Sequence, residues 1–138
     1  MNQYLIEKFG DKVQAITLEV QVPDTTGTYY LPDSATLRGK QIVALAVPGN
    51  PNTNANSPTG RAIVSDAAQQ SSFLTLKENN DAILDRYPMS ILLQTSGVKE
   101  IAPVDFCNLN PQSSYIQVTN VSLIAAGQSF LIVVYYLA

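Results

Sequence analysis

Residues 16–22 read ITLEVQV, so that apolar and polar side chains alternate along this segment. A period of two is typical of a β-strand with one buried face, and the members of that face are Ile16, Leu18, Val20 and Val22. Glu19 falls on the opposite face and is expected to lie in water. The residues that follow, PDTTG at 23–27, have the composition of a turn that ends the strand.

Further strand-like segments follow, and turn residues separate each from the next. They lie at 28–31, 41–47, 62–65, 71–77, 89–94, 98–101, 114–118, 121–125 and 129–137. Residues 131–137 are apolar throughout, which is typical of a central strand covered on both faces. The one helical prediction covers residues 81–86 and ends before Tyr87-Pro88.

This order of strands and turns predicts an all-β chain folded as a single antiparallel β-sandwich, an eight-stranded jelly roll. Residues 1–12 are expected to form an N-terminal arm, and residues 13–138 the jelly-roll domain. The predicted core takes apolar residues from most of the strands, namely Ile16, Leu18, Val20, Leu45, Phe73, Leu92, Ile116, Leu131 and Val133.

Composition limits the chemistry that this chain can perform. Of its 138 residues, 46% are hydrophobic and 14% are charged, and the formal net charge is −3. The hydrophobic share excludes a disordered chain, and the few Lys and Arg residues argue against binding of duplex nucleic acid. The absence of His, with a single cysteine, removes the commonest general base and an ordinary zinc site. We therefore expect no catalytic residue, no metal and no cofactor.

The closest acidic pairs and the cysteine have structural interpretations. Asp81 with Asp85, and Glu100 with Asp105, could supply paired carboxylates, but solvated surface or helix-cap roles suit them better. The second pair is expected in a loop, and Cys107 is expected to be a buried structural thiol. No signal peptide or transmembrane run is visible, so we expect the protein to fold in the cytoplasm of the cell that makes it.

Residues 48–60, PGNPNTNANSPTG, form the clearest loop. They include three prolines, two glycines and four asparagines, and carry no charge. Pro and Gly interrupt regular strand pairing, and a loop of 13 residues is longer than most connections in compact domains. The segment is either a solvated surface loop or a contact loop that docks on a neighbouring protein or a ligand.

The C-terminal third of the chain is poor in charge, since Asp105 is the only charged residue between 101 and 138. Exposed strands of soluble monomers normally carry Lys and Glu, so this region predicts a subunit interface; an unusually complete internal core is the alternative. The N-terminal arm is apolar and is expected to reach a neighbouring subunit. The candidate interface residues are Tyr4, Leu5, Ile6, Phe9, Asn50, Asn52, Asn54, Tyr135 and Tyr136.

The pattern of an apolar arm, uncharged Asn- and Pro-rich loops and a strongly apolar last strand resembles that of small virion structural proteins. It is carried by LPDSATLRGKQIVALAV at 31–47 and FLIVVYYLA at 130–138. In size and pattern the chain is similar to the penton proteins of tailless, membrane-containing icosahedral bacteriophages. That resemblance implies a homopentamer at the capsid vertex of the virion, in contact with the major capsid protein and with a spike protein.

Two other classes of function remain open at this point. One is a receptor- or carbohydrate-binding β-sandwich module of a phage spike or fibre, with Tyr and Asn side chains on its loops. The other is an enzyme, which the missing His disfavours.

Overall fold

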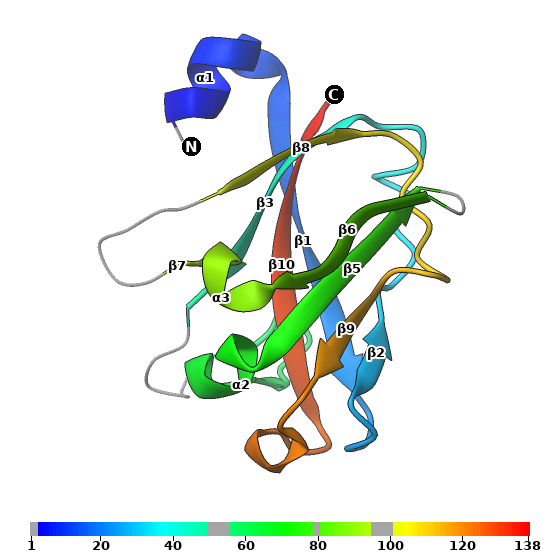
Figure 1. Cartoon of the computed structure of the whole chain (residues 1–138). Helices are drawn as coiled ribbons and strands as arrows, with labels where there is room; N and C mark the ends of the chain where they lie inside the picture. The colour runs from blue at the N-terminus through cyan, green and yellow to red at the C-terminus, as the bar shows by residue number, and fades with distance from the viewer. Residues whose placement is uncertain (1–2, 50–55, 79–80, 95–100) are drawn as a thin grey trace.

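A computed structural model of the chain describes residues 3–49, 56–78, 81–94 and 101–138. Two β-sheets stack face to face, and short helices lie at their ends (Figure 1). The helices are α1 (Gln3–Phe9), η1 (Gly10–Lys12), α2 (Asp66–Gln70), α3 (Met89–Leu92) and η2 (Val121–Leu123). The strands are β1 (Val13–Val22), β2 (Thr28–Tyr30), β3 (Ile42–Pro48), β4 (Ala62–Ile63), β5 (Ser72–Glu78), β6 (Asp81–Pro88), β7 (Leu93–Gln94), β8 (Ala102–Phe106), β9 (Tyr115–Val118) and β10 (Gln128–Leu137).

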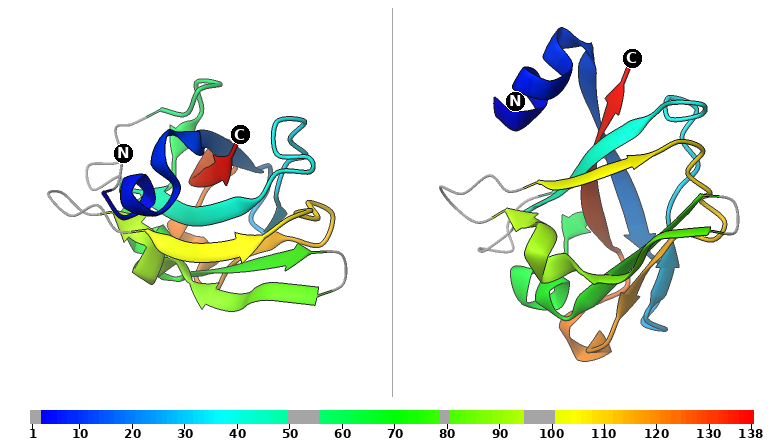
Figure 2. Two further views of the ribbon diagram at one scale, coloured as in Figure 1. Left: turned by 90° about the horizontal axis from the view of Figure 1, so that it is seen from above. Right: turned by 45° about the horizontal axis from the view of Figure 1, so that its top comes forward.

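The strand pairings are nested within one another. β5 pairs with β6, β3 with β8, β2 with β9 and β1 with β10, and all four pairs are antiparallel. Successive pairs alternate between a six-stranded sheet, β1-β10-β3 with β4, β7 and β8 at its margins, and a four-stranded sheet, β2-β9-β5-β6. The predicted antiparallel β-sandwich is thereby confirmed, and Figure 2 shows its two layers from above.

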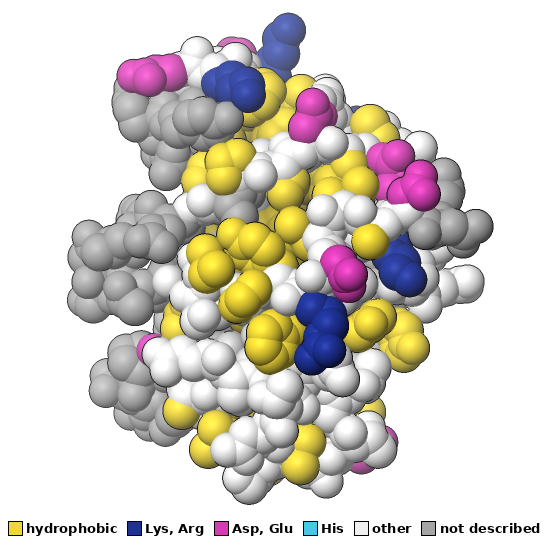
Figure 3. Space-filling view, viewed as in Figure 1, with side chains coloured by type: hydrophobic (Ala, Val, Ile, Leu, Met, Phe, Trp, Pro, Cys, Tyr) yellow, Lys and Arg dark blue, Asp and Glu magenta, His cyan; other side chains and the backbone are white. Residues whose placement is uncertain are grey.

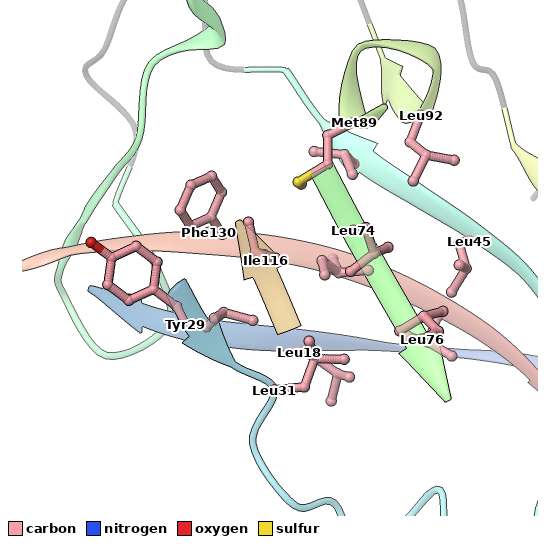
Figure 4. Close-up of a cluster of buried hydrophobic side chains, with 14 of the residues drawn as sticks. Leu18, Tyr29, Leu31, Leu45, Leu74, Leu76, Met89, Leu92, Ile116 and Phe130 are labelled. Carbon is pink, nitrogen blue, oxygen red and sulfur yellow. The ribbon is translucent and has the colours of Figure 1, made fainter. Parts of the chain in front are cut away.

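The core lies between the two sheets and takes residues from both (Figure 4). Of the predicted core residues, Leu18, Val20, Leu45, Leu92 and Ile116 are buried as expected. Ile16 is only partly buried but packs against the same cluster. Phe73 is partly buried, and Leu74 and Leu76 are the residues of β5 that enter the core.

The wrong residues of the last strand were predicted to face the core. Leu131 and Val133 are only partly buried, whereas Phe130, Ile132 and Val134 enter the core. Pairing with β1 explains this, because Phe130 lies opposite Val20, and Ile132 lies opposite Leu18. Residues directly opposite in an antiparallel pair share a face, so the alternation in β1 sets the inward face of β10.

Several local predictions were also wrong. Residues 81–86 are strand rather than helix, because β6 pairs along the length of β5 and this tertiary pairing outweighs local preference. Residues 102–106, expected in a loop, form β8 against β3. Residues 121–123 form η2 instead of a strand, since the Asn120 side chain accepts a hydrogen bond from the Ser122 backbone N–H.

Two short helices were missed by the sequence patterns. α2 begins after Ser65, whose hydroxyl caps it by accepting a hydrogen bond from the Ala68 N–H at 3.2 Å. α3 replaces the start of a predicted strand, and its buried residues Met89 and Leu92 are spaced by one helical turn. Both helices are too short for periodicity alone to reveal.

Candidate interaction surfaces

Helix α1 packs its apolar side against the outer face of the six-stranded sheet, close to both ends of the chain (Figures 1 and 2). Leu5 is fully buried there against Val13 and Val43. Phe9, one helical turn further on, is partly buried in the same cluster, whereas Ile6 is 43% exposed. The predicted arm is therefore a helix that covers its own sheet, and Leu5 is not at the surface.

The other candidate interface residues are scattered. Tyr135 is partly buried beside α1, but Tyr136 points to the opposite face and is 7% exposed, with its hydroxyl donating to the Gln14 side chain at 3.1 Å. Tyr136 is thus a core residue rather than a surface one. Tyr4 lies in α1, but its side chain is outside the described part of the structure. Asn50, Asn52 and Asn54 lie outside the described residues.

The outer face of the six-stranded sheet also holds a polar cluster around Glu19, which was expected to lie in water. Its Oε2 accepts hydrogen bonds from the hydroxyls of Ser57 at 2.9 Å, Thr59 at 2.6 Å and Ser129 at 2.9 Å. Arg61 donates from Nε to the Ser129 hydroxyl at 3.1 Å and from Nη2 to the Val22 carbonyl at 3.3 Å. The hydrogen bonds of this cluster connect residues 56–61 to β1 and β10.

Burial and hydrogen bonding act on the Glu19 carboxyl in opposite directions. Burial disfavours its charged form, but the hydroxyls of Thr59, Ser57 and Ser129 favour that form more strongly. The pKa of Glu19 is therefore held below its ordinary value. Because the three hydroxyls lie 38, 40 and 110 residues from Glu19 in the sequence, no local motif could have indicated this cluster.

A different surface is formed by the four-stranded sheet. Its outer face carries Tyr30, which is 57% exposed, and Tyr115, whose ring centroid lies 5.7 Å from that of Tyr30. On β5 and β6 the Arg86 guanidinium lies over the Phe73 ring at 5.4 Å from its centroid. Figure 3 shows this face, on which hydrophobic side chains gather near Lys and Arg. Aromatic rings combined with a cation make it a candidate contact surface.

Two hollows adjoin one another beside β2. The first has a volume of about 350 Å³ and lies between the β2–β3 loop and the β8–β9 loop. The second has a volume of about 510 Å³ and lies beside β1 and β2, where Glu19 and Tyr30 are among its lining residues. Pro32 lines both hollows, so the two lie next to each other.

The acidic pairs and the cysteine are placed as follows. Asp81 and Asp85 are both exposed on β6, while Glu100 lies outside the described residues. Asp105 is exposed on β8 and accepts a hydrogen bond from the Gln41 amide. Cys107 is partly rather than fully buried, and its backbone N–H donates to the Glu78 carboxylate at 2.8 Å.

Within the described ranges, no group of three or more Cys, Asp or Glu residues is arranged to hold a metal ion. None of the helices that the structure describes has the length and hydrophobicity needed to span a lipid bilayer.

Comparison of the chain with protein-family models, with curated proteins and with solved structures finds no match. Proposals about function therefore depend on the geometry of this chain.

Proposed function

We propose that the chain is a structural protein of an icosahedral virion that closes into a homopentameric ring at the capsid vertex. The nested pairing of β1 with β10, β2 with β9, β3 with β8 and β5 with β6 carries this proposal. Four nested pairs that alternate between two sheets are what an eight-stranded jelly roll requires. That fold recurs among viral capsid proteins, lectins and cupins.

The amino-acid composition of the chain favours a viral capsid protein over a cupin. Cupins hold their metal mainly with His, and this sequence has none. Assembly is further supported by large apolar side chains at the surface. The exposed large hydrophobic residues are Ile6, Tyr30, Ile91, Val121 and Leu123.

A closed ring needs two different faces on each subunit, one that meets the preceding copy and one that meets the next. One candidate is the end of the molecule where Ile6 is exposed beside the partly buried Phe9. The other is the opposite end, where Val121 and Leu123 of η2 are 39% and 38% exposed (Figure 1). The major capsid protein would contact the outside of the ring, and a spike protein would bind on its axis.

The mass of the protein in solution tests this proposal, together with its presence in particles. A pentamer has five times the 14.9 kDa mass of one chain, which native mass spectrometry or light scattering distinguishes from a monomer. We expect the pentamer in solution and the same chain in purified virions. A monomer at every concentration, with no chain in purified virions, would refute the proposal.

A further inference from the structure

We propose that the two adjoining hollows beside β2 bind a short, uncharged oligosaccharide. This inference is independent of the pentamer and of the capsid, because it concerns the surface of a single chain. Both hollows are formed by the described residues, and Pro32 is part of the lining of each. Their volumes, about 350 Å³ and about 510 Å³, fall in the range of small-molecule binding sites.

The loops around the first hollow are held in place by hydrogen bonds to the sheets. The Leu31 N–H donates to the Ser114 carbonyl at 3.0 Å, and the Asn110 N–H donates to the Lys77 carbonyl at 2.9 Å. Leu37, at the centre of the β2–β3 loop, is 3% exposed and anchors that loop in the core. A site whose walls are already ordered loses little conformational entropy when a ligand binds.

Tyr30 supplies the exposed aromatic ring of the proposed site. It lines the second hollow two residues before Pro32, and the Tyr115 ring supports it from the neighbouring strand. The planes of the two rings are inclined by 59°, so Tyr115 meets Tyr30 at an angle rather than covering one of its faces. An aromatic face of this kind can pack against the apolar C–H face of a pyranose ring.

Planar polar side chains line both hollows. Asp33, Arg38 and Asn108 line the first hollow, and Glu19 and Gln21 line the second. Carboxylates accept hydrogen bonds, guanidinium groups donate them, and amides do both, which matches the hydroxyl groups of a sugar. Pro111 and Leu109 add apolar wall to the first hollow.

The charges favour an uncharged ligand over an anionic one. Arg38 forms an ion pair with Asp33. Among the described residues that line the two hollows, Arg38 is the only cation, and Glu19 adds a negative charge beside Tyr30. A sialic acid or a phosphate would therefore meet no unpaired positive group. Two neighbouring hollows favour at least two sugar units over one.

Titration of the ¹⁵N-labelled chain followed by NMR tests the proposal. The probes are maltotriose, cellotriose, triacetylchitotriose and mannotriose, with 3′-sialyllactose as the anionic comparison. We expect at least one neutral trisaccharide to shift the backbone amides of Tyr30, Asp33 and Arg38, with a Kd of about 1 mM or tighter. The corresponding monosaccharide should bind about tenfold more weakly, because it occupies one hollow only.

Variants then assign the binding to this site. Tyr30→Ala and Asp33→Asn should each weaken the trisaccharide about tenfold. Ile91→Ala and Asp85→Asn, at exposed positions away from the hollows, should leave its affinity unchanged. Unshifted amides elsewhere in the spectrum show that each variant is folded. The proposal is overturned if no neutral trisaccharide shifts these amides, if 3′-sialyllactose binds most tightly, or if Tyr30→Ala and Asp33→Asn bind as the native chain does.

Discussion

The hydroxyl of Ser129 donates a 2.9 Å hydrogen bond to Oε2 of Glu19, across 110 residues of sequence. The contact joins β1 to β10 on the outer face of the six-stranded sheet, and it lies beside the 2.6 Å hydrogen bond from Thr59. Through these hydroxyls one carboxylate connects the first strand, the last strand and residues 56–61. The stability of this face therefore depends on the ionisation of Glu19.

The Glu19→Gln variant is expected to lose less thermal stability than the native chain as the pH is lowered into the acid range. The folded state holds the pKa of Glu19 below its ordinary value of 4.5. The ionised carboxylate therefore contributes its full stabilisation of the fold at pH values above 4.5. This stabilisation is lost as pH falls through the lower pKa of the folded state. Thermal unfolding of the native chain and Glu19→Gln, measured from about pH 6 to pH 2, checks this. Asp24 and Asp33 also have lowered pKa values in both proteins, so the difference between the curves isolates Glu19. Parallel curves would contradict the prediction.

Leu5→Ala is expected to lower the free energy of unfolding by about 2–4 kcal/mol, because it leaves a cavity under α1. Leu5 is 0% exposed, whereas Ile6 beside it is 43% exposed. Ile6→Ala should therefore change stability by less than about 0.5 kcal/mol while weakening self-association. Urea denaturation and light scattering measure the two effects. Equal losses of stability in both variants would show that α1 does not pack as described.

Phe130→Ala is expected to destabilise the sandwich by about 3–5 kcal/mol, since a fully buried aromatic ring is removed. Leu131→Ala, at the next position, should lower the free energy of unfolding by only about 1 kcal/mol, because that side chain faces outward and is partly buried. Denaturant unfolding of the two variants gives the comparison. The reverse order would place β10 in the opposite register against β1.

Gly27→Ala is expected to lower the free energy of unfolding more than Gly127→Ala does. Both glycines have positive φ, at +101° and +95°, so alanine is strained at either position. A Cβ at Gly27 would also lie 3.2 Å from the Val118 carbonyl oxygen and 3.2 Å from Val121 Cγ1, whereas nothing lies within 4 Å at Gly127. This crowding should make the loss of unfolding free energy about 1 kcal/mol larger for Gly27→Ala than for Gly127→Ala, as measured by denaturant unfolding. Equal effects would show that both β9 at Val118 and η2 at Val121 can move aside.

The alternation at 16–22 was sufficient to predict β1, because only one assignment of faces buries its apolar side chains. The same reasoning failed at residues 131–137, where both faces are apolar and partner strands decide which one enters the core. Residues 81–86 were missed for a related reason, since their strand is defined by pairing with β5. Local sequence cannot report such partners.

The candidate surfaces were harder to predict than the fold. The apolar character of the N-terminal residues was recognised, but their partner was not, because Leu5 packs against Val43 of the distant β3 as well as Val13 of the adjacent β1. Tyr30 gave no signal in sequence. Asp33 and Asn108, which line the adjoining hollow, come from two separate loops that only the sandwich brings together.

The nesting of the strand pairs has a consequence for how the protein folds. The two strands of hairpin β5–β6 are separated by a short loop. Each pair outside this hairpin encloses a longer stretch of chain, and the β1–β10 pair encloses the longest. Refolding should therefore be slow for a chain of this size, in milliseconds to seconds, as stopped-flow fluorescence can measure. During synthesis β1 and β3 emerge well before β10, the strand that lies between them. Until β10 emerges from the ribosome, the edges of β1 and β3 that will pair with it are exposed. In that interval they can aggregate with other chains or be bound by chaperones.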